Sequence, residues 1–279
     1  KGISPYPYML ILPQDAHERL LIEALAGLGV QVERGSELLE VEQGAGRIVA
    51  RLRRADGTED RCETLYLAGC DGAHSRVRAA IGANFPGGTY AHRFYVADVV
   101  AQGPVTNGEL HVALDDEDFL GVFPMQGEGH VRLVGTVKQQ ADDAPAPQWA
   151  DVQGTALRRL GIEVAQVNWF STYHVHHRVA APWRQGGTFL LGDAAHLHSP
   201  VGAQGMNTGI ADATNLGWKL AAVLRGRAAP ALLESFEAER IPFARRLVAT
   251  TDRMFTLATS PGLVARILRT QLLPRAMAL

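Results

Sequence analysis

The middle of the chain and its two flanks differ in their pattern of hydrophobic and polar positions. In the middle, short apolar runs are divided by turn signals such as Asn107-Gly108 and the glycine-containing residues 127–129. Runs of this length between such turns are typical of an antiparallel sheet. The predicted strands are residues 93–100, 110–114, 119–124 and 131–137. After a polar linker at 139–147 and a helix at 148–160, we expect a further strand pair within residues 163–179.

The flanks combine short apolar strands with helices. Three strand–turn–helix units are expected, and their strands are residues 10–14, 64–69 and 188–191. Two longer helices are predicted, one from near residue 206 to 224 and one from 231 to about 257, which contains Pro242. On the first of these, Trp218 and a stripe of small and apolar residues are expected to pack inward: Ile210, Ala213, Gly217, Leu220 and Leu224. The fold class is therefore α/β (α+β overall), with an antiparallel sheet inserted between the strand–helix units.

The first unit ends its strand at Gln14. Asp15 and Glu18 have the spacing of an N-terminal capping box, with Asp in place of Ser or Thr, and Gly29 is placed to end the helix. Gln14 therefore stands at a strand–helix junction, either as an ordinary polar residue at a helix start or as a ligand contact.

The second unit places Cys70-Asp71-Gly72 after its strand. Asp71-Gly72 is a turn signal, and Ser75 is a candidate cap for a helix that begins at Arg76. An ordinary turn, in which the Asp71 carboxylate accepts hydrogen bonds from backbone N–H groups, is as consistent with this pattern as a ligand site.

The third unit contains the most informative stretch of the sequence, residues 189–224. Its strand breaks at Gly192-Asp193, and a loop rich in glycine and proline leads into the helix. Such a unit aims free backbone N–H groups and the positive helix end at one point, which suits an anion or an electron-rich carbonyl edge. A carboxylate at Asp193 would accept hydrogen bonds from the hydroxyls of a sugar or ribityl chain.

The order of these residues resembles a known family. The pattern G-D…P-x-G-x-x-x-x-N-x-G…D-A-x-N-L-x-W-K-L, together with the earlier C-D-G segment, is similar to the flavin-contact motifs of the FAD-dependent aromatic hydroxylases. These are group A flavoprotein monooxygenases of the para-hydroxybenzoate hydroxylase type. The cofactor-binding residues that the resemblance implies are Gln14, Asp71, Gly72, Arg76, Gly192, Asp193, Pro200, Gly202, Gly205, Met206 and Asn207.

The resemblance also implies individual roles. Asp71 and Asp193 would contact the ribityl or pyrophosphate part of FAD, and Arg76 would support the cofactor or the NADPH side. Pro200 would lie against the flavin ring. The backbone N–H groups of Gly205 and its two successors would stabilise negative charge at flavin N1 and O2. No catalytic side chain is indicated, because the cofactor performs the chemistry in this family.

The implied activity is hydroxylation of an aromatic substrate, phenolic or polyketide-like. It would use FAD, NADPH or NADH, and O2, through a flavin C4a-hydroperoxide. Two alternatives stay open: a flavin-dependent halogenase or reductase of the same fold, and a flavin- or ligand-binding protein without turnover.

The G-x-G-x-x-G fingerprint that opens this family does not occur in the sequence. The resemblance therefore implies an internal fragment of a longer protein, inactive alone. Its expected parts are a partial FAD-binding domain (1–89), a sheet domain for the substrate (90–180), the second part of the FAD-binding domain (181–228) and a C-terminal helical region (229–279).

Composition narrows the choice of partners. The 279 residues have a net charge of −2, so composition points to no nucleic-acid or membrane partner. Cys62 and Cys70 lack metal or redox spacing, and no metal site is expected because the resemblance accounts for the histidine clusters. A cytoplasmic enzyme acting on a small aromatic molecule is the expectation, with a homodimer left open.

Overall fold

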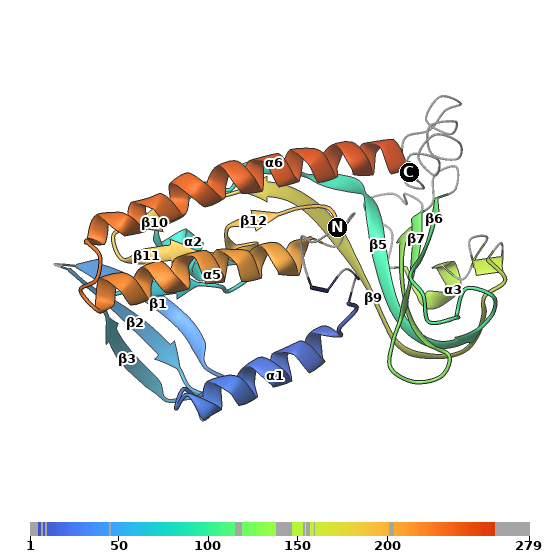
Figure 1. Ribbon diagram of the computed structural model, residues 1–279, viewed down its shortest axis with the longest axis horizontal. Coiled ribbons are helices and arrows are strands. Elements are labelled where there is room, and N and C mark those ends of the chain that lie inside the picture. The colour runs from blue at the N-terminus through green and yellow to red at the C-terminus, as the bar shows by residue number, and fades with distance from the viewer. Residues whose placement is uncertain are drawn as a thin grey trace. The chain divides into compact units, whose positions relative to one another are not determined.

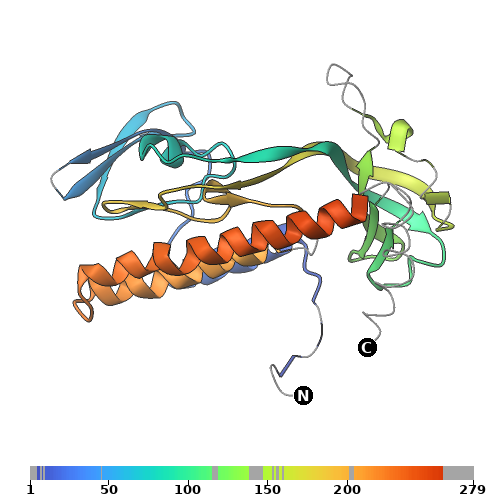
Figure 2. The ribbon, with the colours of Figure 1, turned by 90° about the horizontal axis from the view of Figure 1, so that it is seen from above.

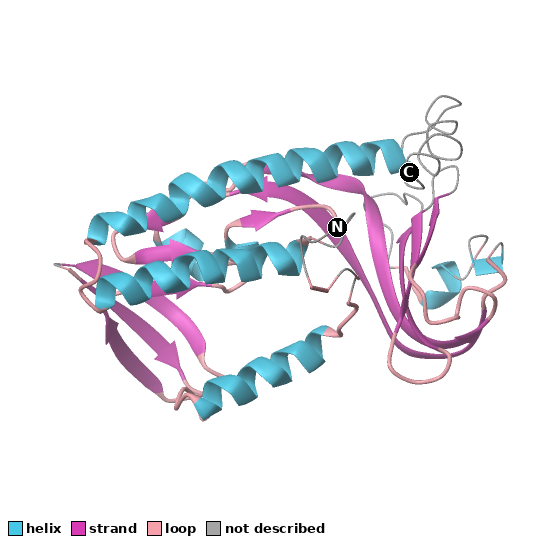
Figure 3. Cartoon of the chain, viewed as in Figure 1, coloured by secondary structure: helices cyan, strands magenta, loops and turns pink. Residues whose placement is uncertain are grey.

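The computed structural model describes residues 5, 6, 8, 10–44, 46–114, 119–137, 147–152, 154, 157–158, 160–200 and 204–259 (Figure 1). The chain divides into two compact units. The first contains residues 1–33, 92–173 and 258–279, and the second contains residues 34–91 and 174–257. Mixed helices and antiparallel strands confirm the predicted fold class (Figure 3).

The first unit is built on an antiparallel sheet with the strand order β9-β5-β8-β7-β6. Its core contains Tyr95, Val99, Leu120 and Leu133, which are almost fully buried. A bidentate ion pair joins Arg132 of β8 to Asp98 of β5, at 2.7 and 2.8 Å. The elements of this unit are α1 (Gln14–Gly27), β5 (Gly87–Gln102), β6 (His111–Leu114), β7 (Phe119–Pro124), β8 (His130–Val137), α3 (Trp149–Val152) and β9 (Glu163–Val179), of which β5 and β9 run on into the second unit.

The second unit combines two small sheets with two long helices. A meander of β1 (Glu37–Gly44), β2 (Arg47–Arg53) and β3 (Glu59–Thr64) precedes β4 (Leu67–Gly69). Strand β4 pairs in parallel with β11 (Thr188–Leu190). The remaining elements are α2 (Arg76–Ala80), β10 (Arg184–Gln185), a 3-10 turn η1 (Gly192–Ala194), β12 (His196–Leu197), α5 (Gly205–Leu224), a second turn η2 (Pro230–Leu233) and α6 (Glu234–Thr259).

The core of the second unit lies under α5 and α6. Trp183, Phe189, Leu233 and Phe236 have no exposed surface and pack with Leu216 of α5. Helices α5 and α6 lie side by side, as both views show (Figures 1 and 2). An ion pair joins the two helices: Nζ of Lys219 on α5 lies 2.8 Å from Oε2 of Glu239 on α6.

The four strands predicted between residues 93 and 137 are confirmed, as are the helix starts near residues 206 and 231. The strand predicted at 10–14 is wrong, because residues 10–13 form no strand and α1 begins at Gln14. The capping box is wrong as well. Pro13 is the N-cap, and Asp15 forms an ion pair with Arg19 instead. Gly29, at φ +77°, follows the end of α1 as expected.

Two other strand predictions are corrected. Residues 64–69 do not form one strand, because the Thr64 hydroxyl donates to the Tyr66 carbonyl at 2.9 Å in a turn between β3 and β4. Residues 163–179 form one long strand, β9, rather than a pair. Within the predicted helix 148–160 the structure gives α3, and residues 153, 155, 156 and 159 lie outside the described residues. The predicted linker lies outside them too, except for Pro147.

The inward stripe predicted on α5 is wrong at most of its positions. Ile210, Trp218 and Leu224 are 40%, 55% and 60% exposed, whereas Leu220 packs against the core as predicted. The buried positions of the helix are instead Thr208, Asp212, Leu216 and Lys219. Three of these four are polar, and two of the three are ionisable.

Replacing Gly69 with alanine should destabilise the second unit. A Cβ atom at Gly69 would lie 2.7 Å from Cβ and Cγ1 of Val77, which is 2% exposed, so the backbone of β4 or α2 must shift. Overpacking of this kind costs about 1–3 kcal/mol. Urea denaturation of the variant and the wild type measures the change in the free energy of unfolding. Gly44→Ala is the control, since a Cβ there has no neighbour within 4 Å and should change stability little. Equal stability of both variants would contradict the expectation.

Candidate functional site

The turn after β11 presents Asp193. Gly192 has a φ of +56°, a conformation that favours glycine, and it begins the short turn η1. The turn is closed by a hydrogen bond from the Ala195 N–H to the Gly192 carbonyl, at 2.8 Å. The Asp193 carboxylate is exposed, and no hydrogen bond joins it to another side chain or backbone group in the described part of the chain. It is free to accept hydrogen bonds from a ligand.

Helix α5 lies against this turn one helical turn after its start. A Cβ built on Gly209 would be only 3.4 Å from the Gly192 Cα, so two glycines allow the helix and the turn to meet closely. Helix α5 is 20 residues long, and its N-cap Gln204 makes no capping hydrogen bond through its side chain. The N–H groups of the first turn, at Gly205, Met206 and Asn207, therefore receive no capping hydrogen bond from this N-cap side chain. They form the positive end of a long helix.

A buried network fixes the turn to the helix. Asp212 of α5 has no exposed surface. Its Oδ2 atom accepts a hydrogen bond from the Gly192 N–H at 3.1 Å and lies 2.8 Å from His196 Nε2. Its Oδ1 atom accepts from Arg240 Nε at 2.6 Å. Burial alone would raise the pKa of Asp212, but His196, Arg240 and the Gly192 N–H together hold it below its ordinary value. The carboxylate is therefore ionised at neutral pH.

His198 presents a free nitrogen beside the start of α5. Its Nδ1 atom lies 2.8 Å from the Ser199 carbonyl, which only accepts, so Nδ1 carries the proton. Burial is the largest influence on this ring and lowers the pKa of His198, so the side chain is neutral at pH 7. Its Nε2 atom is buried and has no partner in the structure as described. A Cβ at Gly205 would lie 3.7 Å from the ring, which places this acceptor next to the first turn of α5.

The Asp71 carboxylate is largely engaged in structure. It accepts hydrogen bonds from the Ser75 hydroxyl at 2.5 Å and from the N–H groups of Arg76 and Val77 at 2.7 and 3.1 Å. Ser75 caps α2 as predicted, accepting from the Arg78 N–H at 2.9 Å. The ordinary-turn alternative therefore describes most of what Asp71 does in this structure. Gly72, at φ +78°, completes the turn.

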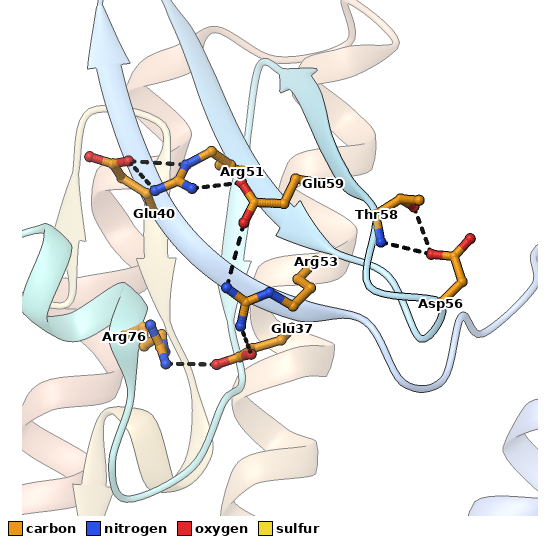
Figure 4. A network of polar contacts seen from close by, with 8 residues as sticks. All are labelled: Glu37, Glu40, Arg51, Arg53, Asp56, Thr58, Glu59 and Arg76. Carbon is orange, nitrogen blue, oxygen red and sulfur yellow. Dashed lines mark hydrogen bonds and ion pairs between the residues drawn. The ribbon is translucent and has the colours of Figure 1, made fainter.

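Of the two arginines in this segment, Arg78 reaches the turn at Asp193. Its guanidinium donates to the Ala194 carbonyl at 3.0 Å and lies 3.9 Å above the Phe85 ring. Arg76 is exposed and forms an ion pair with Glu37 at 2.7 Å, at the edge of a charged network on the meander (Figure 4). That network also includes Glu40, Arg51, Arg53 and Glu59.

Three predicted cofactor-binding residues remain: Gln14, Pro200 and Gly202. Gln14 is exposed, and its side chain donates to Glu18 at 3.1 Å. Pro200 is half-buried, and Gly202 lies outside the described residues. The structure thus brings Gly192, Asp193 and the start of α5 together, and ties Asp71 to them through α2. Gln14 belongs to the other unit, and its prediction stays a prediction.

Sequence reasoning missed Asp212, Arg240, His196 and Arg78 as site residues. One signal was present: Asp212 and Lys219 are seven residues apart and share a helix face with Leu216. Charged residues in line with a buried leucine indicate buried ion pairs. Within the described residues, no group of three or more His, Cys, Asp or Glu side chains could hold a metal ion. None of the described helices is long and apolar enough to cross a membrane.

Residues 3–251 match the family model described as the FAD binding domain. The chain belongs to this family. It is 37% identical over 266 residues to 6-methylpretetramide 4-monooxygenase of Streptomyces rimosus, a match that covers 95% of this chain and 47% of the relative. It is 33% identical over 273 residues to pentachlorophenol 4-monooxygenase of Sphingobium chlorophenolicum, covering 95% of this chain and 51% of that one.

A solved structure agrees with these sequence matches. The anhydrotetracycline hydroxylase from Streptomyces rimosus superposes with a TM-score of 0.75 at 31% identity, covering 99% of this chain and 57% of that chain. These matches confirm the resemblance to the group A aromatic hydroxylases. The chain spans about half the length of the curated relatives that it matches.

Proposed function

We propose that the intact protein is an FAD-dependent monooxygenase that hydroxylates an aromatic substrate with O2 and NADPH or NADH, in the cytoplasm. One observation carries the proposal: the turn η1, which bears the exposed Asp193 carboxylate, packs against α5 near the end whose N-cap side chain makes no capping hydrogen bond, in a chain of the FAD-binding domain family. The relatives named above are monooxygenases of aromatic compounds, which supports the same reaction class here.

The residues fit a flavin in two ways. The exposed Asp193 carboxylate is suited to accept hydrogen bonds from the hydroxyls of the ribityl chain. The N–H groups of Gly205, Met206 and Asn207 are suited to donate to the carbonyl edge of the isoalloxazine ring, where negative charge gathers on reduction. His198 Nε2 offers one further acceptor at the same place. FAD, when bound, supplies the activation of O2.

The protein's part in the reaction is positioning and charge stabilisation. The Asp193 carboxylate accepts hydrogen bonds, whereas the N–H groups at the α5 N-terminus donate them. Together they would fix the orientation of a flavin as well as its affinity. Asp71 and Arg78 support the turn at Asp193 indirectly. Asp71 accepts hydrogen bonds from the first N–H groups of α2, and Arg78 of α2 donates to the carbonyl of Ala194, the residue after Asp193.

The proposed substrate class comes from the relatives and is stated only as a class. One relative acts on 6-methylpretetramide and another on pentachlorophenol. The shared chemistry is a hydroxylated aromatic ring, so we propose a phenol or an aromatic polyketide as the substrate.

Isotope labelling tests the reaction. The intact protein should oxidise NADPH slowly alone and faster with its phenolic substrate, and should form a product that is one oxygen heavier. Under ¹⁸O-labelled O2, mass spectrometry should find the label in that product. Label taken up only from water would contradict the monooxygenase assignment. Bound FAD with NADPH oxidation that no phenol accelerates would favour a reductase or a flavin-binding protein without turnover.

A further inference from the structure

The turn that bears Asp193 has little structure of its own. It is three residues long, and Asp193 is exposed. Two contacts from outside hold its backbone: Arg78 at the Ala194 carbonyl, and Asp212 at the Gly192 N–H. Because Gly192 directly precedes Asp193, the Asp212 contact restrains the backbone from which the Asp193 side chain projects.

Asp212 is also tied to the start of α5. Its partner Arg240 donates a second hydrogen bond to the Thr208 carbonyl at 3.4 Å, and Thr208 lies one turn before Asp212. Its other partner, His196, is 1% exposed and stacks on Trp183, with 5.4 Å between the ring centroids. Through these hydrogen bonds Asp212 links the turn η1 to Arg240 of α6 and, through Arg240, to Thr208 in the first turn of α5.

Stability alone does not account for this arrangement. Burying several ionisable groups has a large desolvation cost, and well-packed apolar residues of similar volume are often as stabilising or more so. The same unit already has an apolar core around Trp183 and Phe236. A buried charged network is instead well suited to fixing one geometry among several.

We propose that Asp212 is a positioning residue for the flavin site, which acts through the Gly192 N–H and Arg240 to align the Asp193 carboxylate with the N–H groups at the start of α5. The proposal rests on the proposed function, because it assigns to Asp212 a role in the affinity for FAD. Asp212 itself is fully buried, so it would act through the groups that it contacts and not by direct contact with FAD.

The test compares two substitutions in the same pair of helices, made in the intact protein. Asp212→Asn keeps the shape and removes the charge. Glu239→Gln removes the charge opposite the fully buried Lys219, two turns further from the start of α5. Each apoprotein is titrated with FAD by flavin fluorescence, and each melting temperature is measured. Both variants should lose thermal stability, but only Asp212→Asn should weaken FAD binding, by about tenfold (~1.4 kcal/mol).

Each outcome decides the proposal. FAD affinity of Asp212→Asn within twofold of wild type overturns it, and so does equal weakening by Glu239→Gln. If Asp212→Asn does not fold, Arg240→Lys takes its place, because it keeps the charge but changes the hydrogen bonds to Asp212 and Thr208. Arg240→Lys should then weaken FAD binding while Glu239→Gln does not. An intact wild type that binds no FAD overturns the proposed function, whereas the twofold result overturns this proposal alone.

Discussion

Replacing Asp193 with alanine is expected to weaken FAD binding by the intact protein about fivefold to 150-fold. This range corresponds to ~1–3 kcal/mol, the usual contribution of a hydrogen bond to a charged group. The reason is geometric as well as electrostatic. The carboxylate is exposed in η1 and forms no hydrogen bond within the described chain, so a ligand contact would be its main hydrogen bond. Titration of the apoprotein with FAD, followed by flavin fluorescence, measures the effect.

Two variants sharpen this test. Asp193→Asn keeps one acceptor oxygen and removes the charge, so its affinity should lie between those of wild type and Asp193→Ala. Glu63→Ala removes an exposed carboxylate of the same unit that pairs with Arg47 on the meander, at 3.0 Å. It should leave the affinity for FAD unchanged. If Asp193→Ala binds FAD as tightly as Glu63→Ala, the carboxylate has no part in cofactor binding.

The sheet of the first unit could be predicted well because its signals are local. Strands β6, β7 and β8 are short, and each is bounded by residues that favour turns, so pattern and pairing agree. Strand β9 could not be predicted in the same way. It has 17 residues, far more than the usual five or six, and a run of that length suggests a turn that is not there.

The sequence predicts the motif residues of the candidate site but not the residues that support them. Gly192, Asp193 and the start of α5 at Gly205 belong to one local stretch of sequence, and their expected chemistry follows from a strand that ends before a helix. Asp212 and Lys219 depend on Arg240 and Glu239 of α6, whose positions no periodicity in α5 reveals. Most of the apolar stripe that periodicity favoured is exposed in this structure, as Trp218 shows at 55%, and only Leu220 packs against the core. The buried face of α5 instead carries the residues that form ion pairs with α6.

Replacing Trp183 with alanine is expected to cause the largest loss of stability, ~3–5 kcal/mol in the free energy of unfolding. Trp183 has no exposed surface and lies among Phe189, Phe236 and His196. Its indole N–H donates to the Ala180 carbonyl at 2.9 Å, so the substitution removes a large apolar volume and leaves that acceptor without its donor. Urea denaturation followed by circular dichroism measures the loss.

Trp169 provides the matched control, since it is the same residue type on strand β9 but 50% exposed. Trp169→Ala should cost under about 1 kcal/mol, because much of its ring is already in contact with water. Trp183→Phe should fall between the two alanine variants, since it keeps a ring against His196 and loses only the N–H donor and part of the volume. Because Trp183 stacks on His196, which contacts Asp212, its loss should also weaken FAD binding, whereas Trp169→Ala should not. Equal losses of stability in the two alanine variants would mean that the core of the second unit does not depend on Trp183.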